Sequence, residues 1–163
     1  MFNLEIQTLA RLLIDEARER SLRIVTAESC TGGLVAGAIC AISGASDVFE
    51  RGFVTYTNRA KQELLGVPGD LIADLGAVSE PVARMMAEGA LENSNAHLAV
   101  AVTGIAGPGG GTPMKPVGTV HIATARSNQA LHHKAELFDG VTREEIQLAA
   151  VQAALQALRD RMT

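Results

Sequence analysis

Three polar residues could together carry nucleophilic catalysis without a histidine or a metal. Tyr56 is the single tyrosine of the chain, Lys61 follows five residues later, and Ser46 precedes both in the segment SGASD. A serine can be activated by a neutral lysine and a tyrosine when burial or nearby positive charge lowers the pKa of the lysine. Spacing alone also fits a tyrosine at a strand end and an exposed lysine on a short helix, so both interpretations stay open.

A first glycine-rich turn offers further nucleophiles. Ser29-Cys30-Thr31-Gly32-Gly33 follows a short β-rich run and precedes a run of small apolar residues. Glycine permits positive φ, and the backbone N–H groups of such a turn, with the helix that follows, can hold an anion. Cys30 lies near the predicted helix start, which would lower the pKa of its thiol, but a small buried residue is the ordinary explanation.

A second glycine-rich segment, GIAGPGGGTPMKP, carries five glycines and three prolines between Gly104 and Pro116. Neither segment is a P-loop, because G-x-x-x-x-G-K-[ST] is absent, and neither has the G-x-G-x-x-G pattern. Such a long connection is often functional, so the second segment predicts a lid or a ligand cradle.

The remaining candidates are less specific. The four histidines are expected on strands, outside the glycine-rich turns, and they give no Ser-His-Asp triad; they are His97, His121, His132 and His133. Arg143 would occupy the first position of the last helix, where the helix dipole disfavours a cation. Neighbouring Glu144 and Glu145 could neutralise it, or an anionic ligand could bind there.

The elements that must position these residues alternate along the chain. Apolar periodicity, capping residues and β-branched runs predict helices over 3–20, 34–42, 59–65, 70–75, 80–92 and 142–159 and strands over 23–27, 49–57, 97–103, 117–125 and 131–138. Ser79 is the predicted N-cap of the fifth helix, and Thr142 with Glu145 forms a capping-box pattern for the sixth. The alternation predicts a three-layer α/β/α domain, and the adjacent late strands favour a mixed sheet.

Composition narrows the class of protein. The 163 residues suit one domain, 1–163, with 47% hydrophobic and 20% charged residues. A formal charge of −4 and 3% aromatic residues leave little material for a nucleic-acid surface. No apolar run is long enough for a membrane span, and the acid-containing N-terminus is unlike a signal peptide. Cys30 and Cys40 are ten residues apart without a C-x-x-C motif, which indicates reduced thiols and a cytoplasmic protein.

Five segments, in order, carry a family resemblance: TAESCTGG (26–33), FERGFVTYTNRAKQELLGV (49–67), GAVSEPVA (76–83), VTGIAGPGGG (102–111) and KPVGTV (115–120). Together they resemble the C-terminal domain of the CinA family, the nicotinamide-nucleotide amidases. The resemblance implies hydrolysis of nicotinamide mononucleotide to nicotinate mononucleotide and ammonia, in pyridine-nucleotide recycling, with no cofactor and no metal. Many members carry an additional domain resembling molybdopterin-binding proteins, so this chain is expected to be the stand-alone form.

Carried over position by position, the family's catalytic set falls on Ser46, Tyr56 and Lys61, with Ser29 as the reserve nucleophile. Its substrate-binding residues would fall on Ser29, Thr31, Gly32, Gly33, Thr103, Gly104, Gly107, Gly109 and Arg143. The expected partner is the small-molecule substrate alone, with no nucleic acid and no membrane, and a homo-oligomer is allowed.

Two other functions stay open on the sequence. A non-catalytic nucleotide-binding or partner-binding module could use the same pocket. A metal-dependent amidohydrolase is disfavoured because the sequence has no His/Asp/Glu cluster at ligand spacing.

Overall fold

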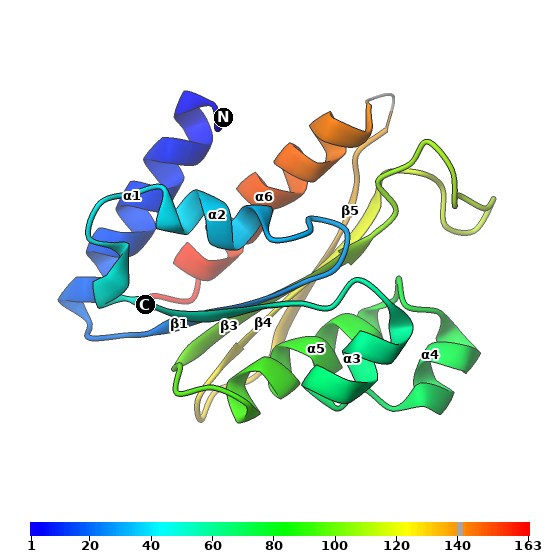
Figure 1. Ribbon diagram of the computed structural model, residues 1–163, viewed down its shortest axis with the longest axis horizontal. Helices are drawn as coiled ribbons and strands as arrows, with labels where there is room; N and C mark the ends of the chain where they lie inside the picture. The colour runs from blue at the N-terminus through cyan, green and yellow to red at the C-terminus, as the bar shows by residue number, and fades with distance from the viewer. Residues whose placement is uncertain (140–141) are drawn as a thin grey trace.

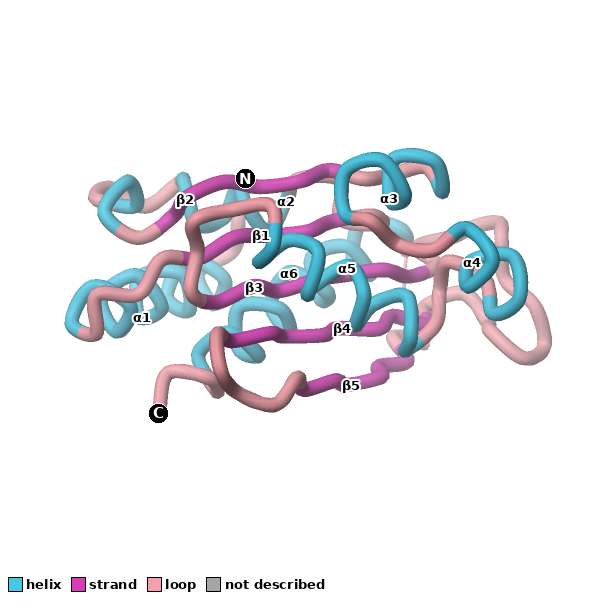
Figure 2. The backbone as a smooth tube through the Cα atoms, turned by 90° about the horizontal axis from the view of Figure 1, so that it is seen from below, coloured by secondary structure: helices cyan, strands magenta, loops and turns pink. Residues whose placement is uncertain are grey.

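One five-stranded sheet forms the centre of the computed structural model, which describes residues 1–139 and 142–163. Its strand order is β2-β1-β3-β4-β5 (Figure 2). The strands are β1 (Ile24–Glu28), β2 (Phe49–Val54), β3 (Leu98–Gly104), β4 (Thr119–Arg126) and β5 (His132–Leu137). β2, β1 and β3 run parallel, whereas β3, β4 and β5 pair antiparallel, which confirms the predicted mixed sheet.

Helices cover both faces of this sheet (Figure 1). In the described residues they are α1 (Leu4–Glu19), α2 (Leu34–Cys40), α3 (Asn58–Leu65), α4 (Gly69–Leu75), α5 (Glu80–Glu92) and α6 (Arg143–Arg159). α1, α2 and α6 lie on one side, and α3, α4 and α5 lie on the other. The three-layer α/β/α architecture is therefore confirmed.

Local side-chain chemistry fixes where several helices begin. Asn3 caps α1 by accepting a hydrogen bond from the Ile6 backbone N–H, and Ser79 caps α5 in the same way. Thr142 and Glu145 form both halves of a capping box at α6, as the sequence predicts. Each cap satisfies backbone N–H groups that have no partner inside the helix, so these starts are encoded locally.

The two layers of helices pack on differently built faces. α1, α2 and α6 cover a face rich in Ile, Leu and Val, and α5 covers a face whose central strands present Ala27, Ala99 and Ala101. Small residues there let α5 lie close to the sheet. α3 in turn lies close to α5 at Gly89, which has no side chain. A Cβ at this position would stand only 1.9 Å from the Leu65 carbonyl oxygen.

The parallel strands deliver their carboxyl ends to one edge of the sheet. β1 ends at Glu28, β2 at Val54 and β3 at Gly104, and β1 pairs with both others in parallel register. In open α/β sheets this edge is where ligands bind. Both glycine-rich segments start here, so this edge is where a site is expected.

Three elements differ from the sequence prediction. β2 ends at Val54 instead of continuing to Thr57, because the chain turns there into α3, which Thr57 caps. α2 ends at Cys40, and Ser46 lies in a short 3₁₀ helix, η1 (Ala45–Asp47), just before β2. His97 lies immediately before β3 instead of within a strand.

In the described ranges, none of the helices combines the length and the apolar character that crossing a membrane requires.

Two histidines and a glutamate connect the antiparallel half of the sheet to α5. His121 Nδ1 lies 2.8 Å from His133 Nε2, and His133 Nδ1 lies 3.3 Å from Glu80 Oε1. Burial is the main cause that lowers the pKa of both imidazoles. Lys115 adds to the lowering at His121 and Arg84 adds to it at His133, whereas Glu80 opposes both.

We expect this pair to make the fold less stable in mild acid. With folded-state pKa values below the unfolded value near 6.5, the unfolded chain binds more protons, so the free energy of unfolding falls as pH drops from 7 to 5. The slope should be at most about 1.4 kcal/mol per pH unit for each imidazole. Urea unfolding across this range checks it, with the double variant H121Q/H133Q as comparison. An equal slope in both proteins would contradict the assignment.

Candidate active site

The turn after β1 presents a serine at the sheet edge. Ser29 directly follows the last residue of β1, and its backbone N–H donates to the Val102 carbonyl on β3 at 2.9 Å. Gly32 and Gly33 then adopt φ of 56° and 100°, a conformation that L side chains rarely adopt. This strand–turn–helix passage leads into α2 and leaves the Ser29 hydroxyl at the pocket.

Lys61 of α3 meets that hydroxyl inside the protein. Its Nζ lies 2.8 Å from Ser29 Oγ, 2.9 Å from the Thr55 carbonyl oxygen and 3.2 Å from the Tyr56 carbonyl oxygen. The Lys61 residue is only 1% exposed, and burial lowers the pKa of its ammonium group. A buried amine in contact with a hydroxyl is the arrangement that a Ser-Lys nucleophilic pair requires.

Arg143 and Tyr56 lie at the mouth of the same pocket. Arg143 Nη2 donates to Tyr56 Oη at 3.1 Å, and Arg143 Nη1 donates to the Gly107 carbonyl at 2.6 Å. Tyr56 is 59% exposed. The guanidinium therefore joins the start of α6, the connection between β2 and α3, and the second glycine-rich loop.

These groups surround a pocket of about 260 Å³. Thr103 belongs to its wall, and its hydroxyl donates to the Ala77 carbonyl at 2.9 Å. The lining residues are Ser29, Cys30, Tyr56, Asn58, Lys61, Ala77, Val78, Thr103, Gly104, Ala106 and Arg143.

Ser46 lies outside this pocket. It precedes β2, whereas Tyr56 and Lys61 follow the other end of this six-residue strand, roughly 20 Å along at about 3.3 Å per residue. Ser46 lines separate surface hollows near Cys40 and Arg23. The expected grouping of Ser46 with Tyr56 and Lys61 is therefore not formed, and Ser29, the reserve candidate, takes its place beside Lys61.

The other residues named from the sequence divide in the same way. Ser29, Thr103, Gly104 and Arg143 line the pocket, and Gly107 contributes its carbonyl to Arg143. Thr31 is buried and its hydroxyl donates to Glu28, so its side chain serves the turn instead of the pocket. Gly32 and Gly33 shape the turn, and Gly109 is exposed on the loop outside the pocket lining.

Sequence reasoning missed several lining residues. Asn58 reaches the pocket from the first position of α3, Ala77 and Val78 from the α4–α5 connection, and Ala106 from the β3–β4 loop. Nothing in the sequence pattern singles out these four residues. Cys30, considered as a nucleophile, lines the pocket, but burial raises the pKa of its thiol to about 12. It therefore stays protonated at neutral pH.

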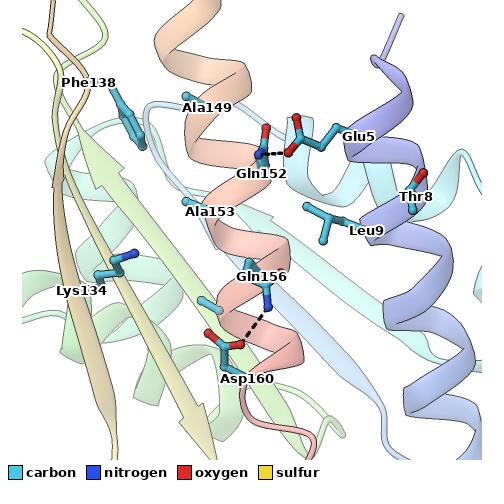
Figure 3. A pocket seen from close by; sticks show the side chains of 11 residues that line it. Glu5, Thr8, Leu9, Lys134, Phe138, Ala149, Gln152, Ala153, Gln156 and Asp160 are labelled. Carbon is cyan, nitrogen blue, oxygen red and sulfur yellow. Dashed lines mark hydrogen bonds between the residues drawn. The ribbon is translucent and has the colours of Figure 1, made fainter.

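A second hollow, of about 440 Å³, lies between α1, α6 and β5 (Figure 3). Several of its polar side chains are hydrogen-bonded: Gln152 donates to Glu5, Gln156 donates to Asp160, and Thr8 donates to the Leu4 carbonyl. Lys134 pairs with Glu136 on its own strand. The hydroxyl–amine contact described above, between Ser29 and Lys61, belongs to the other pocket.

Across residues 1–139 and 142–163, no three His, Cys, Asp or Glu side chains gather in a way that could hold a metal ion.

A mixed α/β/α domain with a buried serine–lysine pair at the carboxyl edge of its parallel strands is the class that the fold and the pocket define. The sequence profile described as the CinA C-terminal domain matches residues 6–162. The chain belongs to this family.

Curated relatives and solved structures are consistent with this family assignment. The chain is 47% identical to a CinA-like protein of Syntrophobacter fumaroxidans over 93% of this chain and 35% of that protein. It is 43% identical to a putative competence-damage inducible protein of Caldicellulosiruptor bescii, over 99% and 39% respectively. The chain thus spans well under half the length of these relatives.

The crystal structure of competence/damage inducible protein CihA from Agrobacterium tumefaciens superposes with a TM-score of 0.97 at 50% identity, covering 98% of this chain and 97% of that chain. A competence damage-inducible protein A from Klebsiella pneumoniae gives 0.91 at 36% identity, with 96% of each chain covered.

Replacing Lys61 by methionine should isolate the titration of the buried amine. Because burial holds its folded-state pKa below the unfolded value, the wild type gains stability as pH rises toward 10.5, and K61M lacks that gain. The unfolding free energy of the wild type minus that of K61M should therefore increase with pH, by at most about 1.4 kcal/mol per pH unit. Urea unfolding from pH 7 to 10 measures it, and a constant difference would mean that Lys61 titrates normally.

Proposed function

We propose that this protein hydrolyses the carboxamide of nicotinamide mononucleotide, giving nicotinate mononucleotide and ammonia. The observation that carries the proposal is the contact of 2.8 Å between Lys61 Nζ and Ser29 Oγ inside a pocket with a permanent cation at its mouth. The choice of substrate follows from membership of the CinA family. Several of the segments that carry the family resemblance contribute residues to this pocket.

Burial favours the neutral amine of Lys61, which is the form that can act as a base. A neutral amine has two N–H donors and one lone pair, and the carbonyls of Thr55 and Tyr56 are two acceptors. When Lys61 is neutral and both donors are so engaged, its lone pair is left for the proton of Ser29 Oγ, which lies 2.8 Å away. The cationic pyridinium ring of the substrate would further disfavour a charged Lys61.

The reaction then proceeds in two steps. Ser29 Oγ bonds to the amide carbon while its proton passes to Lys61, and the developing oxyanion is held by backbone N–H groups of a glycine-rich turn. Lys61 returns the proton to the nitrogen as the C–N bond breaks and ammonia leaves. Water gives a proton to Lys61 and attacks the resulting ester. Lys61 passes that proton to Ser29 Oγ as the ester C–O bond breaks, and the acid that is released ionises to the carboxylate.

Arg143 is the proposed ligand of the 5′-phosphate. A guanidinium binds phosphate through paired N–H donors, and here it stands at the start of α6, where the helix dipole adds positive potential. Tyr56 would then orient Arg143 and close the side of the pocket. Cytoplasmic location is part of the proposal, supported by two cysteines that are both free.

The nucleophile is tested by comparing S29A with S46A. We expect S29A to lower turnover roughly a thousandfold or more, because it removes the attacking atom, and S46A to keep turnover near the wild-type level. Ammonia and nicotinate mononucleotide are measured with purified protein, with and without a chelator. Loss of activity in S46A alone would return the role to Ser46, and wild-type binding without turnover would indicate a non-catalytic nucleotide-binding module.

The phosphate contact is tested by R143Q with two substrates. For nicotinamide mononucleotide, KM should rise roughly 10–100-fold, which corresponds to about 1.4–2.8 kcal/mol of lost binding. For nicotinamide riboside, which lacks the phosphate, the same substitution should change KM little. An equal effect on both substrates would show that Arg143 acts on the pocket as a whole and does not bind the phosphate.

A further inference from the structure

Glu28 is a buried carboxylate that the proposed reaction does not use. It is the last residue of β1, immediately before Ser29, and it is 0% exposed. Its Oε1 accepts from Thr31 Oγ1 at 2.7 Å and from the Val35 N–H at 2.8 Å, and its Oε2 accepts from the Ala36 N–H at 3.0 Å. These partners are all neutral groups of the turn and of α2. A fully buried carboxylate with such partners needs a reason, since burying a charge is costly.

The position of Glu28 gives that reason. Its side chain reaches forward over the nucleophile turn and binds residues on the far side of Ser29. Its backbone carbonyl accepts from the Thr55 N–H at 2.8 Å, and the carbonyl of Thr55 in turn accepts from Lys61 Nζ. Glu28 is therefore bonded both to the turn that carries the hydroxyl and to the segment that holds the amine.

We propose that Glu28 is a positioning residue for Ser29. Its carboxylate fixes the path of residues 29–36, and this keeps Ser29 Oγ at hydrogen-bonding distance from Lys61 Nζ. The proposal rests on the function proposed above, because it assigns a role toward the same nucleophile. It adds a third polar residue to the Ser29–Lys61 pair without any contact to the substrate.

A glutamine cannot replace this carboxylate. One oxygen serves Thr31 and Val35, and the other serves Ala36, so every atom that the two oxygens face is a donor hydrogen. The amide of a glutamine would place an NH2 group against at least one of these donors. A buried donor facing a donor is a costly arrangement that the turn relieves by moving.

The test compares E28Q with wild type in two assays. In the first, steady-state turnover of nicotinamide mononucleotide should show kcat lowered roughly 10–100-fold with KM within about threefold, since pre-organisation of the nucleophile is lost while Arg143 is untouched. In the second, the rate at which a small fluorophosphonate labels Ser29, located by mass spectrometry, should fall by a similar factor.

N3A is the matched control. It removes the capping hydrogen bond of α1 to the Ile6 N–H, far along the chain from the pocket, so it lowers stability while kcat and labelling stay near wild type. A folded E28Q with kcat and labelling within twofold of wild type would overturn the proposal. So would a rise in KM at constant kcat, which would place Glu28 in substrate binding.

A second variant decides if E28Q does not fold. T31V removes one donor to Glu28 and keeps the volume of the side chain, so kcat and labelling should fall roughly 3–10-fold. Unchanged rates in folded T31V would overturn the proposal. If wild type labels at Ser29 but releases no ammonia, the proposed function fails, and the labelling rates of E28Q and T31V still decide the role of Glu28.

Discussion

Burial of the Lys61 amine is the constraint on which the pocket depends. A lysine with 1% exposure is costly to desolvate, and its three hydrogen-bond partners are a hydroxyl and two carbonyls, none of them a carboxylate. The two carbonyls are available because β2 stops at Val54 and the chain turns away from the sheet. α3 carries Lys61 to them because Gly89 lets that helix lie against α5 at the level of Leu65, one turn beyond the lysine. The end of β2 and the absence of a side chain at Gly89 thus determine where the Lys61 amine lies.

Most of the architecture could be predicted because it is encoded locally. The caps at Ser79 and Thr142 and the apolar run of β3 each depend on residues a few positions apart, and the structure has them where the sequence places them. The mixed sheet followed from two β-rich runs without an intervening helix. The predicted end of β2 was wrong. A β-rich composition continues through Thr57, but the chain turns after Val54 because α3 packs on α5.

The site was harder to predict because it depends on which end of a strand each residue occupies. Ser46 and Tyr56 are ten residues apart, and a helical or looped segment could bring them together; the extended β2 separates them. Ser29 and Lys61 are 32 residues apart and in contact, which requires the parallel pairing of β1 with β2 and the return of α3. A resemblance transferred residue by residue identifies the polar set, but only the fold tells which hydroxyl meets the amine. Glu28 gave no signal, since a glutamate before a turn is ordinarily solvated.

The pocket contains two basic residues, Lys61 and Arg143, and their residue types are not interchangeable. An arginine remains charged under any physiological condition, so Arg143 at the mouth is a permanent partner for an anion even though the whole chain carries a formal charge of −4. A lysine changes its charge when it is desolvated, so burial can lower the pKa of Lys61 and make it a base. Exchanging the two would put a permanent cation beside Ser29 Oγ and a flexible point charge at the mouth of the pocket. The position of Arg143 at the start of α6, unfavourable for the helix alone, is thus explained by the pocket, where its Nη atoms bind Gly107 and Tyr56.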